Sequence, residues 1–393
     1  MPPFRPIRFL FAVLACCALP ALAVPYLPKD GRQVVEHLPS RADPVQRELL
    51  RLRTELNAAP NNVALAATLA QRYIEQARID GDPRYLGYAE AALAPWWKLA
   101  QPPEQVLVLR ATLRQSTHQF PAALADLDQA VKRDSGNVQA WITRATVQMI
   151  TGDFTAAKAS CMRLYSRAPQ LVVQTCLSNI ANVTGQGPAS YRQLAASLAA
   201  QRDATPAIRI WVSTLLAEMA ARAGDVPGAE SYYKAALAFD QSDSYLLAAW
   251  SDFLLDQGRA AEVVPLLKDK TRADALLLRY ALALQAVRSP LAGAQVEALR
   301  ARFDAAMLRG DTVHQREQAR YALALRNQPA QAVQLAKLNW AVQKEAADFR
   351  ILAETAAASG DAEARKLVAD WLNKTGLQDQ TVASTLRRLK VAP

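Results

Sequence analysis

Apolar residues recur with a helical period over nearly the whole chain after residue 44, and no stretch shows the apolar–polar alternation of a half-buried strand. The most regular stretch is 209–267, where two predicted helix hairpins have turn glycines, Gly224 and Gly258, that lie 34 residues apart. Asp225 and Pro227 follow the first glycine, as expected where one helix ends in a left-handed residue and the next begins. The pattern predicts an all-α fold of repeated helix hairpins.

Small residues mark the places where the two helices of a hairpin approach closely. In the first hairpin of that stretch they are Ala217, Ala229 and Ala236, while Leu216 and Tyr233 supply bulk beside them. This pattern resembles the tetratricopeptide repeat (TPR), a helix-turn-helix unit of 34 residues. The resemblance implies a right-handed α-solenoid of about nine such repeats, in which each hairpin buries its apolar face against its neighbours.

The repeat pattern weakens over 171–202, and a short polar stretch follows at 201–207. We therefore expect two arrays with a cap at each end, because the exposed ends of a repeat stack need polar outer faces. The predicted segments are a signal peptide at 1–23, a lead-in and capping helix at 24–58, an N-terminal array at 59–200, a C-terminal array at 208–376 and a final capping helix at 377–393.

The first residues have the layout of a signal peptide, with two arginines, an apolar run and then Ala21-Leu22-Ala23. Cleavage after Ala23 predicts a periplasmic or secreted protein without stable membrane insertion. Two alternatives remain open. The leader could stay as a membrane anchor, or a lipid could be attached at Cys16 or Cys17, because Val13-Leu14-Ala15 loosely resembles the sequence before a lipidated cysteine.

Two cysteines, Cys161 and Cys176, remain after the leader is removed. The repeat register places them on helices that pack together, one at the end of a repeat and the other at the start of the next. An exported protein meets an oxidising compartment, which favours a disulfide. Buried free thiols are equally compatible with the pattern, since cysteine is a common core residue.

The net charge of +10 raises the question of an anionic partner. The basic residues are scattered among acidic ones, and the densest late cluster is Arg387, Arg388 and Lys390. Scattered charge is typical of solvated helix faces, so we expect no nucleic-acid binding.

The sequence contains no HExxH, GxSxG, phosphate-binding glycine loop or CxxC motif. Its histidines, His37, His118 and His314, lie far apart along the chain. We predict no catalytic residue, no cofactor and no metal, and therefore a scaffold rather than an enzyme. The alternative is an enzyme, or a subunit associated with one, that acts on cell-envelope polymers.

The resemblance implies that the first helix of each repeat lines a concave groove for a protein or peptide partner, whose identity the sequence does not reveal. The paired Lys and Asn with which some TPR proteins grip a C-terminal carboxylate are replaced here, for example by Val108 and Thr112. Transferring the repeat register predicts the groove residues Trp211, Glu218, Tyr245, Asp252, Arg279, Glu317, Tyr321, Arg350 and Glu354.

Overall fold

The computed structural model describes residue 30 and residues 43–391. The predicted signal peptide and most of the lead-in lie outside the described residues. Contacts group Leu49–Pro393 into one unit and the first 48 residues into another. Within the described part of the chain, no helix is both long enough and apolar enough to span a bilayer.

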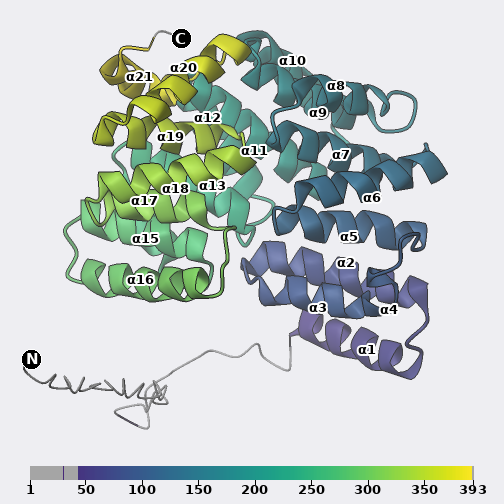
Figure 1. The fold of residues 1–393 in the computed structure, drawn as a ribbon. Coiled ribbons are helices and arrows are strands. Elements are labelled where there is room, and N and C mark those ends of the chain that lie inside the picture. Colours follow the sequence, from purple (N-terminus) through teal and green to yellow (C-terminus); the bar gives the residue numbers. More distant parts are fainter. Residues whose placement is uncertain (1–29, 31–42, 392–393) are drawn as a thin grey trace, which may run out of the picture. The chain divides into compact units, whose positions relative to one another are not determined.

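The described residues form helices and no strands, which confirms the predicted all-α solenoid (Figure 1). They make nine consecutive helix pairs, numbered here as repeats 1 to 9, between α1 (Pro44–Ala58) and a final turn η1 (Gln380–Val382) with α21 (Ala383–Leu389). A short helix, α4 (Ala94–Trp97), follows repeat 1. The pairs are α2 (Val63–Asp80) with α3 (Arg84–Ala92), α5 (Glu104–Ser116) with α6 (Phe120–Arg133), α7 (Val138–Ile150) with α8 (Phe154–Met162), α9 (Gln170–Val183) with α10 (Gly187–Ala200), α11 (Pro206–Ala223) with α12 (Val226–Leu237), α13 (Ser244–Asp256) with α14 (Ala260–Leu267), α15 (Asp274–Ala286) with α16 (Ala292–Leu308), α17 (Gln315–Ala324) with α18 (Pro329–Val342), and α19 (Ala346–Ser359) with α20 (Ala362–Thr375).

The turn within repeat 5 has the predicted chemistry. Gly224 ends α11 with a φ of 80°, a left-handed conformation that a residue with a Cβ adopts only with strain. The Asp225 side chain then accepts a hydrogen bond from the backbone N–H of Gly228 at 3.0 Å, which caps α12. The predicted helix stop and start are therefore confirmed at this turn.

The small residues of repeat 5 also lie where the spacing predicts. Ala217, Ala229 and Ala236 are fully buried, and Tyr233 is buried beside them in the same hydrophobic cluster. A larger side chain at any of the three alanines would force α11 and α12 apart, because a close-packed core has no spare volume.

The last repeats contact the first ones, so the stack turns back on itself. Figure 1 shows the blue helices of the early repeats beside the green and yellow helices of the late ones. At the end of α2, the backbone carbonyl of Ile79 accepts a hydrogen bond from the Ser244 hydroxyl at 2.8 Å, which joins repeat 1 to repeat 6. A Cβ built on Gly81 would lie 2.4 Å from the Cβ of Ala273, at the start of repeat 7. Only glycine fits this contact without a shift.

A second contact of this kind joins repeat 3 to repeats 8 and 9. The backbone N–H of Lys344 donates to the carbonyl of Ile150 at 2.7 Å. The Trp371 ring, which is mostly buried, lies 5.7 Å from the Phe154 ring and against Gly152 in the turn of repeat 3. These contacts hold the late repeats in a tight curve. The side chains on the first helices of those repeats can therefore contact one another.

The predicted break between the two arrays falls in the connection between α10 and α11. The division into separate arrays stays a prediction, and in the structure both belong to the unit Leu49–Pro393.

Candidate partner-binding surface

The predicted groove residues come from the first helices of repeats 5 to 9, and the structure brings most of them together on one inner surface. Five of them line a single cavity of about 50 Å³, together with Arg316 and Arg320, which the sequence analysis did not select. The five are Asp252, Arg279, Glu317, Arg350 and Glu354.

Asp252, on α13, is the centre of one ion-pair cluster. It accepts a hydrogen bond from Arg279 of repeat 7 at 2.6 Å and from Arg320 of repeat 8 at 2.5 Å. Burial alone would raise the pKa of Asp252, but the two guanidinium groups outweigh it and hold that pKa well below the usual range. The carboxylate therefore stays ionised and links three consecutive repeats.

Arg350, on α19, links the last repeat to repeat 6. Its two terminal nitrogens donate to both oxygens of Asp256 on α13, at 2.6 and 2.7 Å, across a separation of 94 residues. Its Nε donates to Glu354 at 2.7 Å. This bidentate pair fixes the spacing between repeats 6 and 9, because guanidinium and carboxylate planes must be aligned to form it.

Arg316, at the start of α17, meets three carboxylates: Glu317 at 3.2 Å, Glu345 at 3.0 Å and the fully buried Asp348 at 3.3 Å. Burial raises the pKa of Glu345, and the negative charge of Asp348 raises it further. Burial lowers the pKa of His118, and the positive charge of Arg316 lowers it further. The ion pairs of Arg316 join α17 to the start of α19.

This part of the inner surface leaves little room for a ligand. The cavity has a volume of about 50 Å³, whereas small-molecule sites usually have about 300–1,000 Å³. The charged residues around it satisfy one another, so they act here as links between repeats. A peptide would have to displace those ion pairs to enter.

The inner surface is open at its other end, where we define the aromatic surface as Trp211, Glu218 and Tyr245. Tyr245 is 60% exposed, yet its hydroxyl donates a hydrogen bond of 2.7 Å to Glu218. The negative charge of Glu218 raises the pKa of Tyr245, and burial raises the pKa of Glu218. Trp211 is 37% exposed and lies two helical turns before Glu218, on the same side of α11.

Tyr321 is the predicted groove residue that the structure places elsewhere. It is buried, its ring packs edge-on against Phe303 at 5.4 Å, and its hydroxyl lies 3.4 Å from the carbonyl oxygen of Val296. Arg320 occupies the inner position instead, because the orientation of α17 places the Tyr321 ring in the core between α16 and α17. The expectation that Tyr321 faces the groove is therefore corrected.

Several residues of the inner surface were missed by the register, namely Asp256, Arg316, Arg320, Glu345 and Asp348. Asp256 lies four residues after the predicted Asp252, and Arg320 lies three residues after the predicted Glu317, so a search for charged residues at i+3 and i+4 would have found both. Glu345 and Asp348 form the cap at the start of α19 and carried no groove signal of their own.

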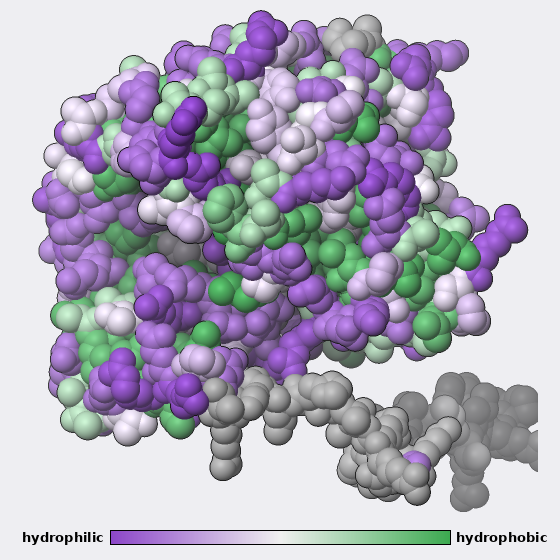
Figure 2. All heavy atoms as spheres, turned by 180° about the vertical axis from the view of Figure 1, so that it is seen from behind, coloured by the Kyte–Doolittle hydropathy of each residue, from purple (hydrophilic) through white to green (hydrophobic). Residues whose placement is uncertain are grey.

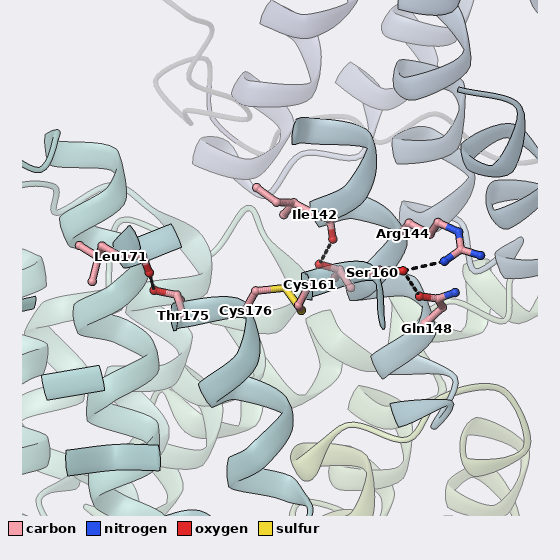
Figure 3. Close-up of a disulfide and its surroundings, with 9 residues drawn as sticks. Ile142, Arg144, Gln148, Ser160, Cys161, Leu171, Thr175 and Cys176 are labelled. Carbon is pink, nitrogen blue, oxygen red and sulfur yellow. Dashed lines mark hydrogen bonds between the residues drawn. A yellow bond between two sulfur atoms is a disulfide. The ribbon is translucent and has the colours of Figure 1, made fainter. Parts of the chain in front are cut away.

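Cys161 and Cys176 are joined by a disulfide in the structure, with their Cα atoms 5.7 Å apart (Figure 3). The bond links the second helix of repeat 3 to the first helix of repeat 4, as the register implies. Beside it, Arg144 donates a hydrogen bond to the Ser160 hydroxyl at 2.6 Å. The disulfide fastens the start of the weak stretch at 171–202 to the repeat before it.

The described residues hold no group of three or more His, Cys, Asp or Glu side chains arranged to bind a metal ion. On the face seen in Figure 2, hydrophilic residues separate the hydrophobic patches from one another. On this face the hydrophobic patches are therefore small and local.

The helix pairs, their buried small residues and their turn glycines define the class of the protein as an α-solenoid of TPR-like repeats. The chain is similar to a tetratricopeptide repeat protein from Parabacteroides merdae, with 14% identity, a TM-score of 0.35 and coverage of 73% of this chain and 98% of that one. It is also similar to the TPR domain of P58(IPK), with 13% identity, a TM-score of 0.21 and coverage of 86% and 95%. No protein-family model matches the chain, and a search of curated proteins finds no significant match.

Proposed function

We propose that the protein is a non-catalytic, exported scaffold that holds a protein or peptide partner at the aromatic surface. A stack of helix pairs presents side chains from several repeats on one surface, which suits it to protein interactions. The observation that carries the proposal is Tyr245, a large side chain that is 60% exposed and yet fixed by its hydrogen bond to Glu218.

An ordered aromatic side chain is a favourable anchor, because binding loses little side-chain entropy when the ring already has its bound orientation. The Glu218 carboxylate below it has a raised pKa, so its charge is poorly compensated in the free protein. A partner that places an apolar side chain on Tyr245 and a Lys or Arg beside Glu218 would supply both missing contacts. The closed ion-pair network behind this surface gives it a rigid support.

Crosslinking and mass spectrometry on envelope extracts test this proposal. The amount of partner captured should fall at least about tenfold with the variant carrying Trp211→Ala and Tyr245→Ala. The melting temperature should change little, because both side chains are exposed. Tyr165→Ala is the matched control, since Tyr165 is also exposed but lies on repeat 3. Recovery of the same proteins at the same level from the double variant would disprove the binding site.

We also propose that the scaffold works in the periplasm after cleavage behind Ala23. The leader pattern supports this location, and a disulfide between Cys161 and Cys176 is compatible with an oxidising compartment. Mass spectrometry of the protein from periplasmic extract should give an N-terminus at Val24 and one disulfide-linked tryptic peptide pair. An intact leader, a lipid on Cys16 or Cys17, or two separately alkylated cysteines would each contradict part of this picture.

A further inference from the structure

The outer face of the last repeat carries a groove that the partner-binding surface does not use. It has a volume of about 460 Å³ and lies between α20 and the residues that follow α21. Its α20 side is a single helical stripe, because the contributing positions are three, four or seven residues apart. The lining residues are Ala362, Arg365, Lys366, Ala369, Asn373, Lys390 and Val391.

The charge of this groove is one-sided. Arg365, Lys366 and Lys390 are exposed around it, and the lining contains no carboxylate. Lys366 pairs with Asp370 at 2.6 Å, but both side chains are more than half exposed, so water screens that pair. A ligand with negative charge would gain attraction from three cations at once.

The floor of the groove suits a helix rather than a flat surface. Ala362 and Ala369 lie two helical turns apart on α20 and leave room for close approach, while Val391 provides an apolar wall opposite them. The opposite face of α20 is already buried, with Val368, Trp371 and Leu372 in the core.

The last helix helps to form one wall of the groove. α21 packs on α19, and its Leu386 and Leu389 are buried in the same cluster as Trp371. Lys390 and Val391, which follow α21, thereby line the groove opposite α20. From the charge and the shape together, we infer that the groove binds an acidic amphipathic helix of a partner protein.

A display selection tests the inference. The probe is a library of helical hairpins in which one 14-residue helix, the length of α20, carries randomised charged and small apolar positions. Selection against the full chain should enrich helices with Asp and Glu on one face and Ala or Leu beside it. Enrichment of neutral or basic helices, or no enrichment, would overturn the inference.

Two variants then locate the binding. Ala369→Trp fills the groove without changing its charge, and the double variant Arg365→Glu with Lys390→Glu reverses the charge. Each variant should lower the affinity for the selected helix by at least about tenfold. The matched control is Lys268→Glu with Arg300→Glu, which makes the same charge change at exposed residues of α16 and the turn after α14. Equal weakening by the control would show nonspecific attraction, and so would overturn the inference.

Two further measurements separate this groove from other sites. The first is binding of the protein to vesicles that contain anionic phospholipid. If the protein binds these vesicles and no helix, and Ala369→Trp removes the vesicle binding, the groove is a lipid site and the inference is refuted. The Trp211→Ala and Tyr245→Ala variant should bind the selected helix normally, because the aromatic surface lies on α11 and α13. The groove and the proposed function can therefore fail independently.

Discussion

Two bidentate arginine–aspartate pairs of this protein have the same chemistry and opposite surroundings. In repeat 2, Arg110 donates to both oxygens of Asp126 at 2.9 and 2.7 Å, and the side chains are only 4% and 2% exposed. On the inner surface, Arg350 and Asp256 make an equally short pair, but each side chain is 27% exposed. The first pair spans 16 residues and the second spans 94.

The difference separates two structural roles. The Arg110–Asp126 pair fastens α5 to α6 inside one repeat, and Arg110 also donates to the carbonyl oxygens of Trp97 and Leu99 in the preceding connection. Both charges there are buried, so loss of Asp126 leaves the Arg110 guanidinium without water or counterion. The Arg350–Asp256 pair instead connects repeats that are distant in sequence, and water can replace either partner.

The largest effect is expected from Asp126→Asn, which removes the charge that faces Arg110 and Arg114. It should lower the free energy of unfolding by about 3–5 kcal/mol, because a buried guanidinium is left without its counterion. Urea unfolding followed by circular dichroism measures the loss. Asp128→Asn is the control, since the exposed Asp128 pairs with Arg144 at 2.8 Å and should cost less than about 1 kcal/mol. Similar losses in both variants would remove the distinction between buried and exposed pairs.

The disulfide is the next strongest local link. Replacing Cys161 and Cys176 together by alanine should cost about 3 kcal/mol, because the bond restricts a loop of 15 residues in the unfolded chain. The measurement is urea unfolding of the variant and of the oxidised protein. The reduced parent protein is the matched control. Its free energy of unfolding should equal that of the variant, apart from the small contribution of the two sulfur atoms that the variant lacks. An unchanged midpoint would mean that the cysteines do not bond in solution.

Arg350→Gln should cost only about 1 kcal/mol, because both ends of the Asp256 pair reach water. A double-mutant cycle with Asp256→Asn isolates the interaction, and its coupling energy should fall as salt is raised from low to high ionic strength. The Arg110–Asp126 pair, measured in the same way, should show little salt dependence. A coupling energy at Arg350 that is insensitive to salt would show that the inner surface excludes water.

Glu218→Gln should have the smallest effect and the opposite sign. The folded-state pKa of Glu218 is raised above its ordinary value of 4.5, so its contribution to stability is fully present below that value and is lost as pH rises through the folded-state pKa. Glutamine avoids the loss and still accepts the Tyr245 hydrogen bond. The variant should therefore be more stable than the parent at pH 7, by less than about 1 kcal/mol, and no more stable at pH 4.

Glu262→Gln is the matched control for the pH measurement. The hydrogen bond from Arg259 lowers the pKa of Glu262, so its contribution is present above the ordinary value and is lost as pH falls. This variant should be less stable than the parent at neutral pH, and the difference should shrink in acid. A gain at pH 7 for both variants would mean that removing any surface carboxylate stabilises this protein.

The sequence predicted the features that are encoded within about one repeat. Gly224, Asp225 and the buried alanines of repeat 5 are recognisable because a helix stop, a cap and a close approach each need particular residue types at fixed spacing. Pairing between repeats 6 and 9 has no such signature. It depends on the sum of small rotations between successive repeats, and neither Asp256 nor Arg350 carries information about the other. Tyr321 shows the same limit, because a register error of one residue is enough to assign a core residue to the inner surface.

The contacts of Ile79 and Gly81 with repeats 6 and 7 have a consequence for folding. In a linear repeat array each unit touches only its neighbours, so the ends unravel separately and folding can start anywhere. Here the first repeat can make its contacts with repeats 6 and 7 only after at least five further repeats have formed. Such contacts between distant segments raise the cooperativity of unfolding and slow the final step of assembly. This solenoid should therefore melt as one body, and its first repeat should be the last to acquire full protection from hydrogen exchange.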